Sequence, residues 1–171
     1  MSSERYSGLS IIIHWSHALI VLFLVCWGWW MVDLPKGPER GFAIGLHKSV
    51  GIVAFLVLLA RVVWRFTHKP PQEVIVPFYV EQLSKIVHLC LYLLLFVVPI
   101  MGYMSASFTK YNMKFFGLPL PKAGWLDSEI NEVFSQVHGF LAWTLVAFVV
   151  VHIVGAVIHS NSIKRMLHSC N

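Results

Sequence analysis

Three long stretches of the chain contain no charged residue, and this feature most limits what it can fold into. No Asp, Glu, Lys or Arg occurs between Arg5 and Asp33, between Lys85 and Lys110, or between Glu132 and Lys164. Each stretch exceeds the roughly 20 residues that cross the hydrocarbon core of a bilayer as a helix. Because a charged side chain is costly at that depth, we expect each stretch to hold one membrane-spanning helix.

A fourth apolar block runs from about Phe42 to Phe66 and carries Lys48 near one end and Arg61 and Arg65 near the other. Long basic side chains in such places either extend to the headgroups or meet an anion inside the protein. The whole chain is 57% hydrophobic and 12% charged, whereas soluble domains are roughly 25% charged. The blocks lack the alternating polarity of membrane-spanning strands. The sequence therefore predicts an all-α integral membrane protein in contact with lipid.

We expect one domain over residues 1–171, a four-helix bundle with helices over about 9–32, 43–66, 84–108 and 134–160. The segments between these ranges contain Pro, Gly and charged residues, which stop helices. With four spans both termini lie on one side, and the group of basic residues at the end of the second helix favours the cytoplasm for that side. Basic residues flank the spans rather than form a patch, so we expect no nucleic-acid partner.

Seven of the nine histidines fall in or at the edges of the expected spans: His14, His17, His47, His88, His138, His152 and His159. Ionisable residues inside a membrane are rare and usually functional. A single imidazole can also serve only to hydrogen-bond a neighbouring carbonyl. Seven of them together indicate a site.

The spacing of four of these histidines indicates how they pair. His138 and His152 lie ~40° apart around the fourth helix and ~21 Å apart along it, so they share a face. His14 lies near the start of the first helix and His47 near the start of the second. Because successive helices are antiparallel, depth in the membrane pairs His47 with His138 and His14 with His152. The sequence thus predicts two bis-imidazole sites, one towards each side of the membrane.

Two neutral imidazoles from facing helices suit an iron already held by four equatorial nitrogens better than a zinc ion that takes four protein ligands. Helix bundles build cofactor sites in this way. The chain contains no C-x-x-C-H motif, so covalent attachment of a c-type haem is not expected. Arg61 and Arg65, or Lys48, either pair with haem propionates or extend to the headgroups.

Together these residues resemble a known family. The similarity to the bacterial cytochrome b561 family covers nearly the whole chain and lies in IHW (13–15), GLHKSVG (45–51), LARVVWR (59–65), HLCLYLLLFVVPIMGY (88–103), VHGFLAW (137–143) and VHIVGAVIHS (151–160). That family is related to the cytochrome b subunits of nickel-iron hydrogenases and formate dehydrogenases. The resemblance implies a multi-pass protein of the bacterial inner membrane that holds two b haems stacked across the bilayer and exchanges electrons with a quinone. It also implies that the axial ligands are His14, His47, His138 and His152.

Three further histidines have open roles. His17 competes with His14 as a ligand, since spacing alone does not separate them. His88 lies at the depth of His14 and His152, and is either a quinone-site residue or a hydrogen-bonded structural one. His159 lies on the same face as His152 and nearer the cytoplasm. Because imidazole titrates near neutral pH, His159 suits a proton relay to a quinone.

The resemblance leaves two functions open. Small stand-alone members of the family resemble superoxide:quinone oxidoreductases, which implies that superoxide donates electrons on the periplasmic side and that ubiquinone or a related quinone accepts them on the cytoplasmic side. The alternative is a carrier subunit that docks a dehydrogenase, a hydrogenase or another periplasmic redox protein. The periplasmic lysines either attract a small anion or only solvate the loops: Lys48, Lys110, Lys114 and Lys122.

Overall fold

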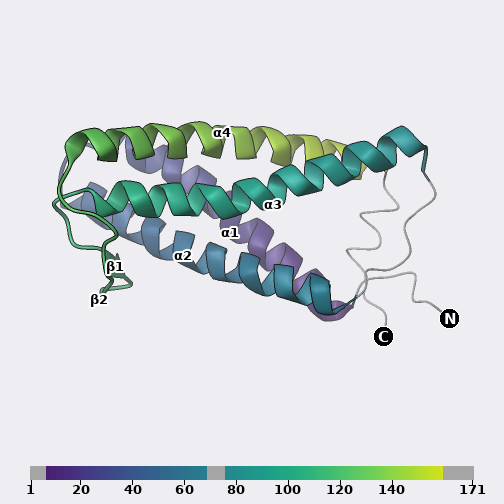
Figure 1. Cartoon of the computed structure of the whole chain (residues 1–171), viewed down its shortest axis with the longest axis horizontal. Coiled ribbons are helices and arrows are strands. Elements are labelled where there is room, and N and C mark those ends of the chain that lie inside the picture. The colour runs from purple at the N-terminus through teal and green to yellow at the C-terminus, as the bar shows by residue number, and fades with distance from the viewer. Residues whose placement is uncertain (1–6, 69–75, 160–171) are drawn as a thin grey trace.

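The computed structural model describes residues 7–68 and 76–159 and shows an antiparallel bundle (Figure 1). The elements in chain order are α1 (Gly8–Val32), α2 (Pro38–Thr67), α3 (Phe78–Ser107), β1 (Lys114–Phe115), β2 (Leu118–Pro119) and α4 (Ser128–Ile158). Each of these four helices is long and apolar enough to cross a membrane. The predicted all-α, four-helix membrane architecture is confirmed.

The helices begin at caps that satisfy their free N–H groups. The Ser7 hydroxyl accepts from the Ser10 N–H at 3.3 Å before α1, and the Asp127 carboxylate accepts from two N–H groups in the first turn of α4. Pro38 is the first residue of α2, a position where the missing N–H costs nothing. The three helices after α1 start earlier than the expected 43, 84 and 134, because residues outside the apolar blocks, such as the capped first turn of α4, are also helical.

The helices associate as two pairs, and we call α1 with α2 the N-terminal pair and α3 with α4 the C-terminal pair. In the first, the Trp27 indole N–H donates to the Ala43 carbonyl at 3.0 Å. In the second, the Asn131 amide donates to the Ser105 carbonyl at 2.7 Å. In each pair, therefore, a side-chain hydrogen bond to a backbone carbonyl joins the two helices near the end where α2 begins.

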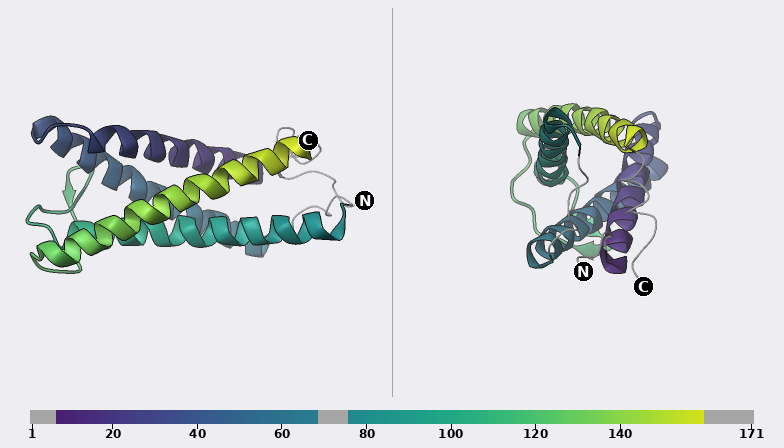
Figure 2. Two further views of the ribbon diagram at one scale, coloured as in Figure 1. Left: turned by 90° about the horizontal axis from the view of Figure 1, so that it is seen from above. Right: turned by 90° about the vertical axis from the view of Figure 1, so that its right-hand side faces the viewer.

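The two pairs meet chiefly where α2 packs on α3, and single rings of α4 contact rings of α1 and α2. Seen from above, α4 runs diagonally from beside α3 at one end towards α1 at the other (Figure 2). We call the end where α2 begins, with β1 and β2, the hairpin end, and the end where α1 begins the opposite end. Rings of α1 and α4 touch at Trp29 and Trp143, with centroids 5.7 Å apart.

Large apolar side chains are exposed along all four helices, as at Leu19, Leu56, Leu93 and Phe140. Such a surface would be unstable in water but suits lipid, because the helices satisfy their own backbone hydrogen bonds. The buried side chains are few and include polar ones: His17 is 2% exposed, close to the 1% of Leu58.

The segment between α3 and α4 forms a small β-hairpin that lies beside α2 (Figure 1). β1 and β2 are antiparallel, and the turn residues Phe116 and Gly117 have φ of 45° and 93°. Glycine adopts such angles freely, whereas phenylalanine does so at a cost in strain. The Phe116 N–H donates to the Ser49 hydroxyl at 3.0 Å, so the hairpin is bonded to α2 next to His47 and Lys48.

Candidate functional site

His47 of α2 and His138 of α4 face each other near the hairpin end. Their ring centroids lie 6.3 Å apart with the planes at 86°. His138 Nδ1 lies 2.9 Å from the Val98 carbonyl of α3. A carbonyl only accepts, so this Nδ1 carries the proton and leaves Nε2 with a free lone pair. His47 Nδ1 is buried and has no hydrogen-bond partner among the described residues.

His14 of α1 and His152 of α4 form a second pair near the opposite end. Their ring centroids are 6.5 Å apart with the planes at 63°. Arg61 Nη2 lies 2.7 Å from His14 Nδ1, and since a guanidinium only donates, Nδ1 accepts there. Depth in the membrane predicted these two partnerships, and the structure brings the same residues together.

The spacing of both pairs fits a metal held between them. Two imidazole nitrogens at about 2 Å from one ion, each about 1 Å from its own ring centre, hold the ring centres about 6 Å apart. The observed separations are 6.3 and 6.5 Å. Among the described residues no three His, Cys, Asp or Glu side chains converge as a metal site. Each pair therefore offers two nitrogen ligands, as an iron in a macrocycle requires.

Tautomers distinguish the two pairs. An imidazole that binds a metal through Nε2 has its proton on Nδ1, which usually donates to a carbonyl or carboxylate. His138 already meets this requirement through Val98. His14 meets this requirement only if its proton moves to Nδ1, which breaks the hydrogen bond from Arg61. The guanidinium would then be released for an anion such as a haem propionate.

The two candidate arginines differ in position. Arg61 is half-buried, bonds His14 and lies over the Tyr92 ring, with 5.5 Å from the guanidinium carbon to the ring centroid. Arg65 is exposed in the last turn of α2. The structure thus brings Arg61, but not Arg65, to a histidine pair.

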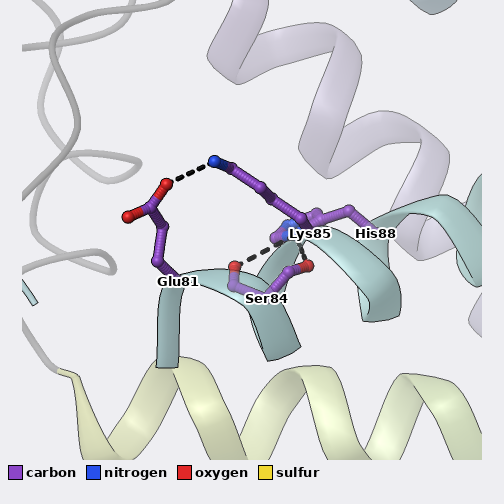
Figure 3. Close-up of polar contacts among 4 residues, drawn as sticks. All are labelled: Glu81, Ser84, Lys85 and His88. Carbon is purple, nitrogen blue, oxygen red and sulfur yellow. Dashed lines mark hydrogen bonds and ion pairs between the residues drawn. The ribbon is translucent and has the colours of Figure 1, made fainter. Parts of the chain in front are cut away.

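His88 of α3 lies against the second pair, with its ring centroid 5.1 Å from that of His152. Its Nδ1 is 2.6 Å from the Ser84 carbonyl and 3.3 Å from the Ser84 hydroxyl. Lys85 and Glu81 form an ion pair on the same turns of α3 (Figure 3). The carbonyl contact holds the proton on His88 Nδ1, so Nε2 can accept a proton.

His17 and His159 lie differently from His88. His17 is buried one turn beyond His14, but the ring found beside His152 is that of His14. His159 caps α4, and its backbone N–H donates to the Gly155 carbonyl at 3.0 Å. Its half-buried side chain stands at the end of the bundle near the His14 and His152 pair.

The hairpin end carries a group of lysines. Lys48 directly follows His47 and lies within electrostatic range of Lys122, whose ammonium donates to the Thr109 carbonyl. Lys110 lies over the Tyr111 ring, and Lys114 is exposed in β1. No lysine at this end forms a salt bridge within residues 7–68 and 76–159, although the carboxylates of Asp127, Glu129 and Glu132 at the start of α4 offset part of their charge.

The roles of Val98 and Ser49 were not predicted from the sequence. Nothing near Val98 signals its role, because Pro99 inside α3 leaves the Leu95 carbonyl, and not that of Val98, without its helical donor. The bond from Ser49 to the hairpin could not be predicted, because a serine within a span more often bonds its own helix. Ser49 also does this, donating to the Gly45 carbonyl at 3.0 Å.

Comparison with known proteins identifies the family. The sequence model described as "Prokaryotic cytochrome b561" matches residues 5–169. The chain is also 33% identical, over an alignment of 187 positions, to "Cytochrome b561 homolog 2" of Escherichia coli (strain K12), with 96% of this chain and 92% of that protein covered. The chain therefore belongs to the prokaryotic cytochrome b561 family and is a multi-pass membrane protein that binds haem b and transfers electrons.

Proposed function

We propose that this protein is a two-haem cytochrome of the bacterial inner membrane, with cytoplasmic termini, that transfers electrons from periplasmic superoxide to ubiquinone or a related quinone. The observation that carries the proposal is the presence of two imidazole pairs at opposite ends of one bundle. In the net reaction two superoxide ions each lose one electron and become dioxygen, and the quinone takes up two electrons and two protons.

Each histidine pair would hold one haem, and each b haem would supply a one-electron redox centre. Arg61 pairs with a propionate near His14 and His152, and Arg65 at the end of α2 adds positive charge beyond it. The support for Arg61 is its half-buried guanidinium beside His14. Arginine suits this role because its fork matches a carboxylate.

The quinone lies at the opposite end in this proposal, beside His88 and His159. His88 touches His152, and its Nδ1–H is held by Ser84, so Nε2 faces away from the helix backbone as a proton acceptor or donor. His159 is placed at the end of α4, where it exchanges protons with water. The two imidazoles therefore deliver the protons that quinone reduction consumes.

The superoxide-reacting end is the hairpin end. Superoxide is a small anion that positive charge attracts, and this end carries Lys48, Lys110, Lys114 and Lys122, none of which forms a salt bridge in the described part of the chain. Attraction of this kind raises the encounter rate of a small anion.

A docking carrier is the second candidate function, and one observation favours it. Large apolar side chains are exposed around the hairpin: Phe116, Leu118, Trp125 and Leu126. Apolar surface of this kind is common where a protein partner binds. In that case a periplasmic dehydrogenase or hydrogenase donates electrons to the same site.

The test of the proposed function uses the full chain purified in detergent. We expect two non-covalent b haems per chain, and rapid reduction of both by superoxide in a stopped-flow spectrometer, followed by oxidation on addition of quinone. Reduction by superoxide no faster than by an uncharged reductant of equal driving force would favour the carrier instead. A haem to chain ratio near one would contradict the two-haem assignment.

A substitution separates the quinone site from the haem sites. His159→Ala should leave both haem spectra unchanged but slow the oxidation of the reduced haems by quinone by about 10²-fold, because general acid–base catalysis supplies rate factors of that size. The measurement is stopped-flow oxidation with a soluble quinone. His68→Ala removes an exposed histidine that stacks on Trp64 and is the control. Loss of a haem from the His159 variant would show that this residue supports a ligand rather than the quinone.

A further inference from the structure

Two glycines lie directly behind the ligand pair at the hairpin end. A Cβ built on Gly28 of α1 would lie 3.1 Å from His47 Cε1 and 3.5 Å from its Nδ1. A Cβ built on Gly102 of α3 would lie 3.1 Å from both Cε1 and Nδ1 of His138. In each helix pair, therefore, the imidazole on one helix occupies space that only a glycine on the other leaves open.

The arrangement is the same on both sides of the site. His47 rests on Gly28 within the N-terminal pair, and His138 rests on Gly102 within the C-terminal pair. The two rings then face each other from opposite sides, 6.3 Å apart. The glycines thus limit how far each ring lies from its neighbouring helix.

The contact at Gly102 also controls a hydrogen bond. Val98 lies one helical turn before Gly102, and its carbonyl accepts from His138 Nδ1 at 2.9 Å. A methyl group at residue 102 would meet this same Nδ1 and would push the ring off the carbonyl. A hydrogen bond of this kind raises the basicity of a ligand imidazole and fixes its orientation.

The required displacement is large for a metal ligand. Non-bonded carbon atoms prefer separations of about 3.5 to 4.0 Å, so a Cβ at 3.1 Å would make the ring give way by a few tenths of an ångström. Metal to ligand distances tolerate changes of only about 0.2 Å. A haem held between the two rings would restrict how far either ring could move away from its neighbouring helix.

We propose that Gly28 and Gly102 are positioning residues for the haem bound by His47 and His138: the missing side chains let each imidazole lie against the neighbouring helix, and this sets the distance between the two ligands. The inference rests on the proposed function, since it needs a haem between these rings. It concerns one of the two sites only. The His14 and His152 pair therefore serves as an internal reference within the same molecule.

The test compares Gly28→Ala and Gly102→Ala in the full-length purified protein. Each variant should bind about one haem per chain, and its optical and electron paramagnetic resonance spectra should match those of His47→Ala. Any haem that remains at the altered site in Gly102→Ala should have a raised midpoint potential, because a weaker bond to Val98 makes His138 a poorer donor to ferric iron. Gly102→Ala should have the larger effect, since its Cβ meets two ring atoms at 3.1 Å.

The control is Gly45→Ala in α2. Gly45 is exposed and nothing lies within 4 Å of its Cβ position, so this variant should keep both haems and both potentials. Two haems with unshifted potentials in Gly28→Ala and Gly102→Ala would overturn the inference, and so would loss of both haems, which would assign the glycines to the bundle as a whole. Fewer than two haems in the unmodified protein would contradict the proposed function instead.

Discussion

Replacing His47 or His138 by alanine will reduce the haem content of the purified protein from two per chain to one, and the haem that remains will be low-spin. Replacing His14 or His152 will have the same effect on the other haem. The physical reason is that, on the proposed function, each pair holds one haem between rings whose centroids lie 6.3 and 6.5 Å apart. Pyridine haemochrome assays give the ratio, and electron paramagnetic resonance distinguishes the two sites.

The pattern among the four variants is the decisive part of this result. The spectra of His47→Ala and His138→Ala should coincide, as should those of His14→Ala and His152→Ala. His17→Ala is an informative comparison, because His17 is buried only one turn from His14. A haem lost from His17→Ala but kept in His14→Ala would reverse the assignment between these two residues.

Replacing Lys110, Lys114 and Lys122 together by glutamine will lower the second-order rate of haem reduction by superoxide about 10-fold at low ionic strength. These lysines lie at the hairpin end and form no salt bridge in the described part of the chain, and on the proposed function their positive charges attract the anion from solution. Salt screens such an attraction, and the variant rate should therefore depend less on ionic strength than that of the unmodified protein. Stopped-flow traces over a series of salt concentrations measure both effects.

Glutamine keeps a hydrogen-bond donor at residue 122, where the lysine ammonium donates to the Thr109 carbonyl, so the loop should stay folded. Lys85→Gln removes a positive charge at the opposite end, where Lys85 pairs with Glu81 (Figure 3), and should leave the superoxide rate unchanged. Equal effects of Lys85→Gln and Lys114→Gln would refute steering by the hairpin end. The quinone half-reaction should be unaffected by the triple replacement.

The helices and the histidine partnerships were predictable because both depend on periodic, local information. Stretches without charge set the number of helices, and the antiparallel order of the helices set the depth of each histidine. The pairing of His14 with His152 follows from those two facts alone. The helix starts were less predictable, since caps such as Asp127 lie outside the apolar blocks.

Other features depend on contacts between distant segments, which a sequence does not display. Arg61 and Arg65 are one helical turn apart and look alike in sequence, yet only Arg61 reaches a histidine. Gly28 and Gly102 look like any small residues in a span until a ring is found against each. The β-hairpin depends on Ser49 of α2, far away in the chain.

The division of the bundle into two helix pairs has a consequence for how the protein is assembled. The N-terminal pair carries His14 and His47, and the C-terminal pair carries His138 and His152. Each proposed haem is therefore liganded once by each half of the chain, and it binds only when the halves are together. A ligand that binds only when the two helix pairs are associated shifts the equilibrium towards the associated state by mass action. On this proposal haem binding should therefore stabilise the association of the two halves.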